Sequence, residues 1–254
     1  MSVDKFAKRT LIRQLTLPSQ GKLYPNLPTG QVRVAAISSR EDKLLAGSGN
    51  STTSKLDLML DRLIDAGALS PNDMLLVDRL FCLFHIRSLS YGDTYTFEYR
   101  CSACGRKQDM TVDIMIDLAV TPAPEDFKEP YEVVLPHSRL NLGLRYFRGS
   151  DEQAVAQFAM KNAGAPLDEG DPAFFYRLSR HIATINGRPV AAIGCAEAVE
   201  LVQNLEGPDT LAFRRALNGV PFGIALTKSV ACTACGEREE VGIPFTSEFF
   251  RPTA

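Results

Sequence analysis

The runs Cys101-Ser102-Ala103-Cys104-Gly105 and Cys232-Thr233-Ala234-Cys235-Gly236 decide how this chain is organised. Each is a C-x-x-C-G knuckle, in which two residues between the cysteines let both sulfur atoms reach one ion and the glycine relieves the tight turn that follows. Two knuckles supply four thiolates, the complete ligand set of a tetrahedral zinc site. Because a closed site leaves no position for water or substrate, the pattern predicts structural zinc bound by Cys101, Cys104, Cys232 and Cys235.

The two knuckles are separated by residues 105–231, a much longer interval than in a compact zinc ribbon. If both knuckles bind one ion, this interval is an insertion whose two ends are held together, and the ion links the middle of the chain to its C-terminal part. A second arrangement stays open, in which each knuckle is a half-site completed by another subunit.

A redox dithiol is the competing interpretation of a C-x-x-C pair. Such motifs are typical of a helix N-terminus near a βαβ unit, whereas residues 94–100 and 227–231 lead into the knuckles from strand-like sequence. We therefore favour zinc. The other two cysteines, Cys82 and Cys195, lie in apolar helical surroundings, and we expect both to pack as small hydrophobic side chains.

Composition limits the classes of function. The chain has 254 residues, 45% of them hydrophobic, which is enough for one large domain or two smaller ones. It has no N-terminal apolar signal region and no apolar run near the roughly 18 residues of a membrane span, so we expect synthesis in the cytoplasm and no membrane contact. With 28 Lys and Arg against 30 Asp and Glu, the formal charge of −2 gives no electrostatic reason to expect nucleic acid.

The first segment, residues 1–40, contains an N-terminal arm, a strap and a first strand. The basic residues 1–16 are either an arm that docks on a neighbour or a partly ordered terminus. Residues 17–25, Leu-Pro-Ser-Gln-Gly-Lys-Leu-Tyr-Pro, are called the strap here. Its prolines remove backbone donors, so we expect an extended, irregular segment laid over a surface by Leu17, Leu23 and Tyr24. Alternating apolar residues predict a strand at 31–37.

The second segment, residues 41–90, is predicted to be helical. A short helix at 40–45 and a loop at 47–54 precede a helix at 55–66 with apolar residues at helical spacing. Ser70 as N-cap and Pro71 at the first helical position open a longer helix to about Ser88. Its broad apolar surface predicts the central buried helix, with His85 as a core or capping histidine.

The remaining chain divides into three segments. Residues 91–120 form a hairpin with the first knuckle at its tip. Residues 121–219 begin with a proline-rich linker and continue as a strand pair and a helical insertion. Residues 220–254 carry the second knuckle and a tail. The expected strands are at 91–99, 109–116, 131–135, 140–147, 221–230 and 240–245. The expected helices run from the Ser150 capping box to 162, from Asp171-Pro172 to 181, at 197–205 and at 208–217. We also expect an exposed turn at His137 and a small hairpin at Asn186-Gly187.

The aromatic pair Phe249-Phe250 beside the terminus either folds back on the core or enters a partner, because exposed apolar patches commonly mark contacts. Together, these features predict an α+β fold. We expect a mixed helical and β-hairpin domain closed by a split, zinc-ribbon-like site of four cysteines.

The order of these features resembles one known family. The Leu17-Pro18-Ser19-x-Gly21-x-Leu23-Tyr24-Pro25 strap, a strand after Gly30, a helical segment and two C-x-x-C-G knuckles are similar to the T4-type baseplate hub assembly proteins of contractile-tailed bacteriophages. The ending Phe249-Phe250-Arg251-Pro252 also looks like endings of phage tail proteins. The strap and the knuckles carry the resemblance, and residues 149–219 add nothing to it.

The resemblance implies a structural role in the hub or wedge region of the baseplate, at the junction of tail tube, spike and tape-measure protein. The expected partners are therefore other phage tail and baseplate proteins. The expected location is the virion, in several symmetry-related copies. We expect the contacts at residues that combine apolar side chains with irregular backbone: Leu17, Leu23, Tyr24, Phe249 and Phe250.

Three other functions compete with this one. An assembly factor would act in the host cytoplasm and be absent from the mature virion. A zinc-ribbon nucleic-acid binder would place basic residues around its knuckles, but Glu237, Arg238, Glu239 and Glu240 follow the second knuckle. An enzyme would need a nucleophile with a base, an open metal site or a phosphate loop, and none of the standard spacings is present.

Overall fold

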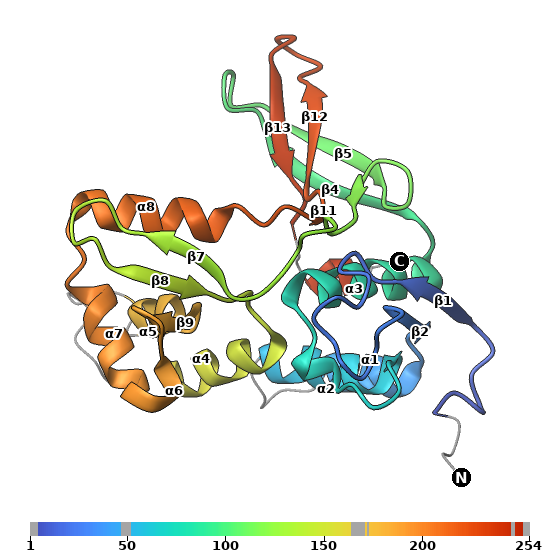
Figure 1. Cartoon of the computed structure of the whole chain (residues 1–254). Helices are drawn as coiled ribbons and strands as arrows, with labels where there is room; N and C mark the ends of the chain where they lie inside the picture. The colour runs from blue at the N-terminus through green and yellow to red at the C-terminus, as the bar shows by residue number, and fades with distance from the viewer. Residues whose placement is uncertain (1–4, 47–51, 164–170, 172, 245–246, 251–254) are drawn as a thin grey trace.

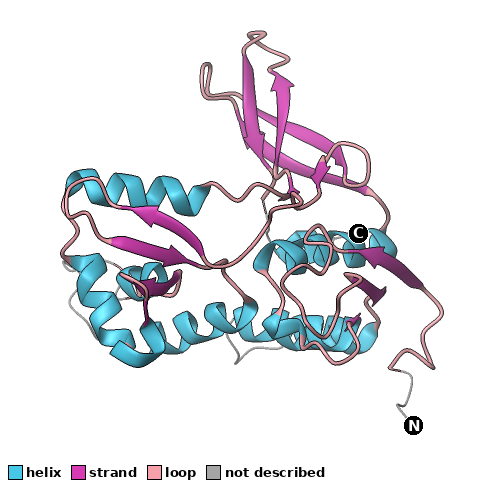
Figure 2. Cartoon of the chain, viewed as in Figure 1, coloured by secondary structure: helices cyan, strands magenta, loops and turns pink. Residues whose placement is uncertain are grey.

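A computed structural model of the chain combines helices with small antiparallel sheets (Figure 2), which agrees with the predicted mixture of helix and strand. Figure 1 shows a part with α1–α3 and β1–β3, a second part with β7–β9 and α4–α8, and two hairpins that project from the body. The structure describes residues 5–46, 52–163, 171, 173–244 and 247–250, with the backbone alone at 52–54 and 247–248. Residues 47–51 of the expected loop, Pro172 and the end at 251–254 lie outside these ranges.

The first sheet has the strand order β1 (Ile12–Thr16), β2 (Gln31–Ala35) and β3 (Ile64–Asp65), all antiparallel. Strand β2 is the strand predicted at 31–37, and its alternate residues Val32 and Val34 are buried. Strand β1 lies in the segment expected to be an arm or a partly ordered terminus. It was missed because only one of its residues, Leu15, is buried, so it lacks an apolar alternation.

The strap and residues 26–30 connect β1 to β2 as a series of tight turns, so the expected extended conformation of the strap is wrong. Backbone hydrogen bonds run from Gln20 N to Leu17 O (2.9 Å) and from Tyr24 N to Gly21 O (2.9 Å). Gly21 and Gly30 both have positive φ. A Cβ on Gly21 would lie 2.3 Å from the carbonyl oxygen of Leu27, so the turns require glycine there.

Four helical elements follow: α1 (Ser39–Ala46), α2 (Thr52–Leu63), the 3-10 turn η1 (Pro71–Asp73) and α3 (Leu76–Tyr91). The single helix predicted from Ser70 is divided. Ser70 does cap a helical turn by accepting from Asn72 N at 3.3 Å, but Met74 and Leu75 are extended. Leu75 forms a β-bridge with Arg148, and this contact with a distant segment overrides the local helical signal.

Helix α3 is the central buried helix that the sequence predicts. Its buried apolar residues include Cys82, Phe84 and Ile86, which belong to the larger of two hydrophobic clusters. Cys82 therefore packs as a small hydrophobic side chain, as expected. The buried His85 ring lies edge-on to Phe81 and its Nδ1 lies 3.1 Å from an Arg13 nitrogen, so this histidine is a core residue.

The second part has its own sheet and its own hydrophobic cluster. The strand order is β10 (Arg188–Pro189), β9 (Ile182–Ile185), β8 (Asn141–Leu144) and β7 (Tyr131–Val134). The predicted hairpin at Asn186-Gly187 joins β9 to β10, with φ values of 49° and 76°. The helices are α4 (Gly149–Lys161), α5 (Phe174–Ser179), α6 (Val190–Ile193), α7 (Cys195–Gln203) and α8 (Gly207–Asn218). The cluster is formed by Leu135, Leu142, Leu144, Ile182, Val202 and Phe213.

Two local predictions in this part are wrong. Helix α4 is not capped by Ser150: the Asp151 carboxylate accepts from Arg148 N at 3.0 Å, so the helix begins earlier. Cys195 is exposed, because it is the first residue of α7 and the helix buries Ala198 and Val202 instead. None of the described helices is long and apolar enough to cross a membrane.

The projecting hairpins are β4 (Thr94–Arg100) with β5 (Lys107–Asp113), and β12 (Thr227–Ala231) with β13 (Arg238–Gly242). A short pair, β6 (Val120–Thr121) and β11 (Gly223–Ile224), joins the chain before and after the second part. The backbone of α9 (Ser247–Phe250) follows the second hairpin and returns to the body. The second part is thus inserted between two paired strands, β6 and β11, of the rest of the chain.

Candidate metal centre

Each knuckle forms the tip of one projecting hairpin, and the two tips have the same backbone geometry. Cys101 N donates to Arg106 O at 3.0 Å and Gly105 N donates to Cys101 O at 2.9 Å. In the second knuckle, Cys232 N donates to Glu237 O at 2.8 Å and Gly236 N donates to Cys232 O at 2.9 Å. The φ angles of 72° at Gly105 and 76° at Gly236 are in the left-handed region that favours glycine. The shared C-x-x-C-G pattern therefore produces the same turn twice.

The structure brings all four predicted ligands together within a single chain. Their sulfur atoms lie within 4.8 Å of one another, with Cys101 Sγ 3.8 Å from Cys235 Sγ and Cys104 Sγ 3.7 Å from Cys232 Sγ. Four sulfurs bound to a tetrahedral Zn²⁺ at about 2.3 Å would be about 3.8 Å apart. The separations are much longer than a disulfide bond. The arrangement is thus compatible with one metal ion shared by both knuckles.

Cys101 and Cys232 are buried, whereas Cys104 and Cys235 face solvent. The backbone N–H groups of Cys235 and Ala234 point at the Cys232 sulfur and lower the pKa of Cys232 to about 6. Burial and the neighbouring cysteine side chains raise the pKa of Cys101 and Cys235, so among these three thiols the surroundings favour the metal-binding thiolate form at Cys232. Such a donor set of four sulfurs suits zinc in a closed structural site.

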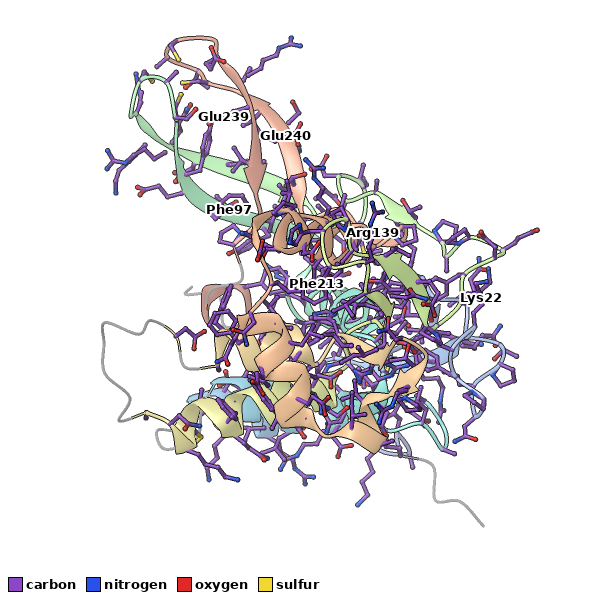
Figure 3. All side chains as sticks on the ribbon, turned by 60° about the vertical axis from the view of Figure 1, so that its left-hand side comes forward. Lys22, Phe97, Arg139, Phe213, Glu239 and Glu240 are labelled. Atoms are coloured by element: carbon purple, nitrogen blue, oxygen red, sulfur yellow. The ribbon has the colours of Figure 1, made fainter. Side chains whose placement is uncertain are left out.

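Two further residues, neither of them predicted as part of the site, connect the two tips. Gln108 of β5 donates from Nε2 to Cys232 Sγ at 3.0 Å, and its Oε1 accepts from Thr233 N at 3.0 Å. Glu239 of β13 accepts from Ser102 N at 3.2 Å. Figure 3 shows Glu239 close to the tips, with Phe97 nearer the body. A signal for both residues exists in the sequence, because they occupy the same place in C-x-x-C-G-x-x-Gln and C-x-x-C-G-x-x-Glu.

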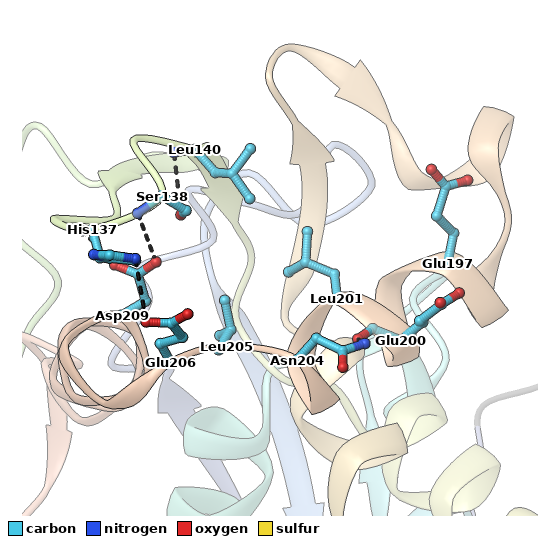
Figure 4. Close-up of a pocket in the computed structure, with 10 residues that line it drawn as sticks. All are labelled: His137, Ser138, Leu140, Glu197, Glu200, Leu201, Asn204, Leu205, Glu206 and Asp209. Carbon is cyan, nitrogen blue, oxygen red and sulfur yellow. Dashed lines mark hydrogen bonds and ion pairs between the residues drawn. The ribbon is translucent and has the colours of Figure 1, made fainter.

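A hollow in the second part contains acidic and apolar side chains (Figure 4). The Asp209 carboxylate accepts from His137 N at 2.7 Å and from Ser138 N at 2.9 Å, so it anchors this turn to the start of α8. The His137 ring is exposed, as predicted, and lies 3.2 Å from Glu206. The Asp209 carboxylate therefore stabilises the fold at this hollow.

The residues predicted to contact a partner lie mostly inside the chain's own core. Leu17, Tyr24, Phe249 and Phe250 are exposed by 1%, 3%, 0% and 7%, and Leu23 is half-buried. Of the two alternatives for the aromatic tail, the structure places both rings back on the core. The partner contact itself stays a prediction.

Phe249 is the centre of an aromatic group that joins the tail to the body. Its ring centroid lies 5.2 Å from that of Phe84 on α3 and 5.0 Å from that of Tyr95 on β4. Both arrangements are edge-to-face, the geometry that aromatic rings prefer. The tail is therefore part of the fold.

Comparison with known proteins identifies one family. Residues 8–251, nearly the whole chain, match the family model described as T4 bacteriophage base plate protein. Searches of the curated proteins and of the solved structures gave no match. The match includes the strap, both knuckles and the second part, so it confirms the resemblance seen in the sequence and extends it to residues 149–219. The chain therefore belongs to the family of T4 bacteriophage base plate proteins.

Proposed function

We propose that this phage baseplate protein is a structural component of the hub or wedge region of a contractile tail, stabilised by one structural zinc ion. The observation that carries this proposal is the convergence of four cysteine sulfurs within 4.8 Å in a chain that matches a baseplate family. A structural baseplate family also suggests a role without catalysis. Tail tube, spike or tape-measure proteins are the partners we propose.

The proposed zinc would act as a cross-link between two hairpins that are far apart in the sequence. When bound, the ion supplies four metal–sulfur bonds and no open position for chemistry. The chain's own residues shape the site. Gly105 and Gly236 permit the two turns, and the buried Cys101 and Cys232 form the side of the cluster that faces away from solvent. The cross-link would hold both hairpins in one orientation for contacts with neighbouring subunits.

The proposed partner contacts need surface that the single chain leaves open. Of the five residues predicted for this role, Leu23 is the one that is neither buried nor part of the tail. The preceding residue, Lys22, holds this part of the strap in place, because its ammonium donates to Ala123 O at 3.0 Å and to Pro124 O at 2.6 Å. We therefore retain Leu23 as a proposed contact and assign the other four to internal packing.

The metal is tested on the purified protein with two matched variants. Cys232→Ser removes a buried ligand, whereas Cys195→Ser removes an exposed cysteine outside the cluster. We expect one zinc per chain in the wild type and in Cys195→Ser, and loss of the ion with a lower melting temperature in Cys232→Ser. Absence of zinc from freshly purified wild-type protein would refute the metal assignment.

The structural role is tested on purified phage particles by quantitative mass spectrometry. We expect the protein in mature particles at a fixed copy number set by baseplate symmetry, for example about three or six in a closed ring. Absence from mature particles, with no tails formed when the gene is deleted, would assign it as an assembly factor instead.

A further inference from the structure

Gln108 and Glu239 are related by the same pseudo-symmetry as the two knuckles. Each follows its own knuckle at the same position, on the strand that leaves the hairpin tip. Each then reaches across to the other hairpin. Gln108 accepts from the N–H of Thr233, and Glu239 accepts from the N–H of Ser102; these donors immediately follow the first cysteine of the opposite knuckle. The two contacts are thus reciprocal.

The two members of this reciprocal pair differ in one respect. The Gln108 amide also donates to Cys232 Sγ at 3.0 Å, and its oxygen also accepts from the Thr233 hydroxyl at 2.7 Å. A carboxylate has no N–H to donate, so Glu239 can only accept. Gln108 therefore donates to the sulfur of one ligand, while Glu239 accepts from the backbone beside a ligand and from the Cys101 thiol.

These contacts join protein atoms of the two hairpin tips directly. We propose that Gln108 and Glu239 are positioning residues of the metal centre: they hold the two hairpin tips in the register that brings the four sulfurs together before zinc binds, and Gln108 also orients the Cys232 sulfur. The inference rests on the proposed zinc site and extends it to residues outside the four ligands. Groups that hydrogen-bond to ligands typically change metal affinity by about 10–100-fold.

The first test measures Zn²⁺ affinity of the full chain by competition with a chromophoric chelator. We expect Gln108→Ala to weaken binding by about 10-fold or more and Glu239→Ala to weaken it less. Gln108→Glu keeps the acceptor for Thr233 but replaces the donor to Cys232 with a negatively charged oxygen, so it tests the contact with sulfur and should weaken binding at least as much as Gln108→Ala. The matched control is Thr111→Ala, which removes an exposed cross-strand contact with Thr96 (2.9 Å) in the same hairpin. Its affinity should stay within about twofold of the wild-type value.

The second test needs no metal and separates failure of this inference from failure of the zinc proposal. Amide hydrogen exchange is measured by NMR on the metal-free full chain. We expect Gln108→Ala to accelerate exchange at Thr233 several-fold and Glu239→Ala to do the same at Ser102, with Thr111→Ala changing neither. If both amides exchange equally fast in the wild type and in these variants, the tips are not preorganised and the inference is wrong. If wild-type protein binds no zinc but the exchange pattern holds, the proposed function fails while the reciprocal contacts stand.

Discussion

At the scale of single residues, the strap is fixed by one tyrosine hydroxyl. Tyr24 Oη donates to Asp78 Oδ2 at 2.6 Å and accepts from Leu75 N at 2.7 Å. Ser19 N donates to the other carboxylate oxygen at 3.0 Å. Burial raises the pKa of both Tyr24 and Asp78. The buried Asp78 carboxylate has few hydrogen-bond donors and depends on each of them. The Tyr24 hydroxyl therefore has a structural role.

We expect Tyr24→Phe to destabilise the protein by about 1–3 kcal/mol, because it leaves the buried Leu75 N–H without its acceptor and removes a donor from Asp78. Denaturant unfolding measures the change. Tyr176→Phe is the control: this ring stacks on Phe158 at 4.3 Å, and its hydroxyl has no partner in the described part of the chain. A loss as small for Tyr24→Phe as for the control would contradict the assignment.

His85 predicts a pH dependence of stability. Burial, with a smaller contribution from Arg13, lowers the pKa of His85 to about 4, whereas an unfolded histidine titrates near 6.5. Between these values the unfolded chain binds a proton that the native chain does not, so the free energy of unfolding falls as the pH drops from about 6.5 to 4. The loss from this one group is up to about 3 kcal/mol.

Urea unfolding at several pH values measures this dependence. We expect His85→Gln to flatten the slope between about pH 6.5 and 4, because glutamine does not titrate. An unchanged slope in the variant would show that other groups, such as His181, whose pKa burial also lowers, cause the dependence.

At the scale of elements, a buried ion pair connects four helical segments. Arg79 of α3 lies 2.5 Å from Asp57 of α2, and it also donates to Asn72 of η1 at 3.0 Å. A Cβ on Gly149, the first residue of α4, would lie 1.5 Å from the Arg79 guanidinium. The absence of a side chain at Gly149 thus makes room for the arginine at the junction of the two parts.

We expect Asp57→Ala to destabilise the protein by about 3–5 kcal/mol, because it leaves the Arg79 charge buried without its partner. The exposed pair Lys107–Glu98 is the control, and Glu98→Ala should cost less than about 1 kcal/mol. Thermal unfolding of both variants measures the difference. Equal losses would mean that burial of the Arg79 pair has no energetic consequence.

At the scale of the whole molecule, the tail closes the larger hydrophobic cluster. Phe249 belongs to that cluster together with residues from β1 to β5, so the tail shares one core with the first strands of the chain. Removal of its ring would leave a cavity among Phe84, Tyr95 and Phe250. The tail therefore contributes to the stability of the single chain.

We expect Phe249→Ala to lower the free energy of unfolding by about 3–5 kcal/mol. Phe174→Ala, at a side chain that is 47% exposed, should have a much smaller effect. Chemical denaturation is the measurement for both. A stable, soluble Phe249→Ala protein that fails to enter particles would instead support the original expectation of a partner contact at the tail.

Local sequence chemistry by itself determined much of this protein. The glycines after each cysteine pair specify the two knuckles, and Asn186-Gly187 specifies a two-residue hairpin. Apolar residues at helical spacing specify α2, and a broad apolar surface specifies α3 as the buried helix. These signals lie within a few residues of one another, so they can be read without knowledge of the fold. The strap and the knuckles were also enough to identify the resemblance to the baseplate family.

Contacts between distant segments decided the rest. The division between η1 and α3 depends on the bridge from Leu75 to Arg148, and the burial of Phe249 depends on rings from α3 and β4. The reciprocal bonds of Gln108 and Glu239 likewise arise only when two hairpins from opposite ends of an insertion meet. A hydrogen bond or a ring contact across such an interval leaves no periodicity in the sequence, so only the tertiary structure could place these side chains.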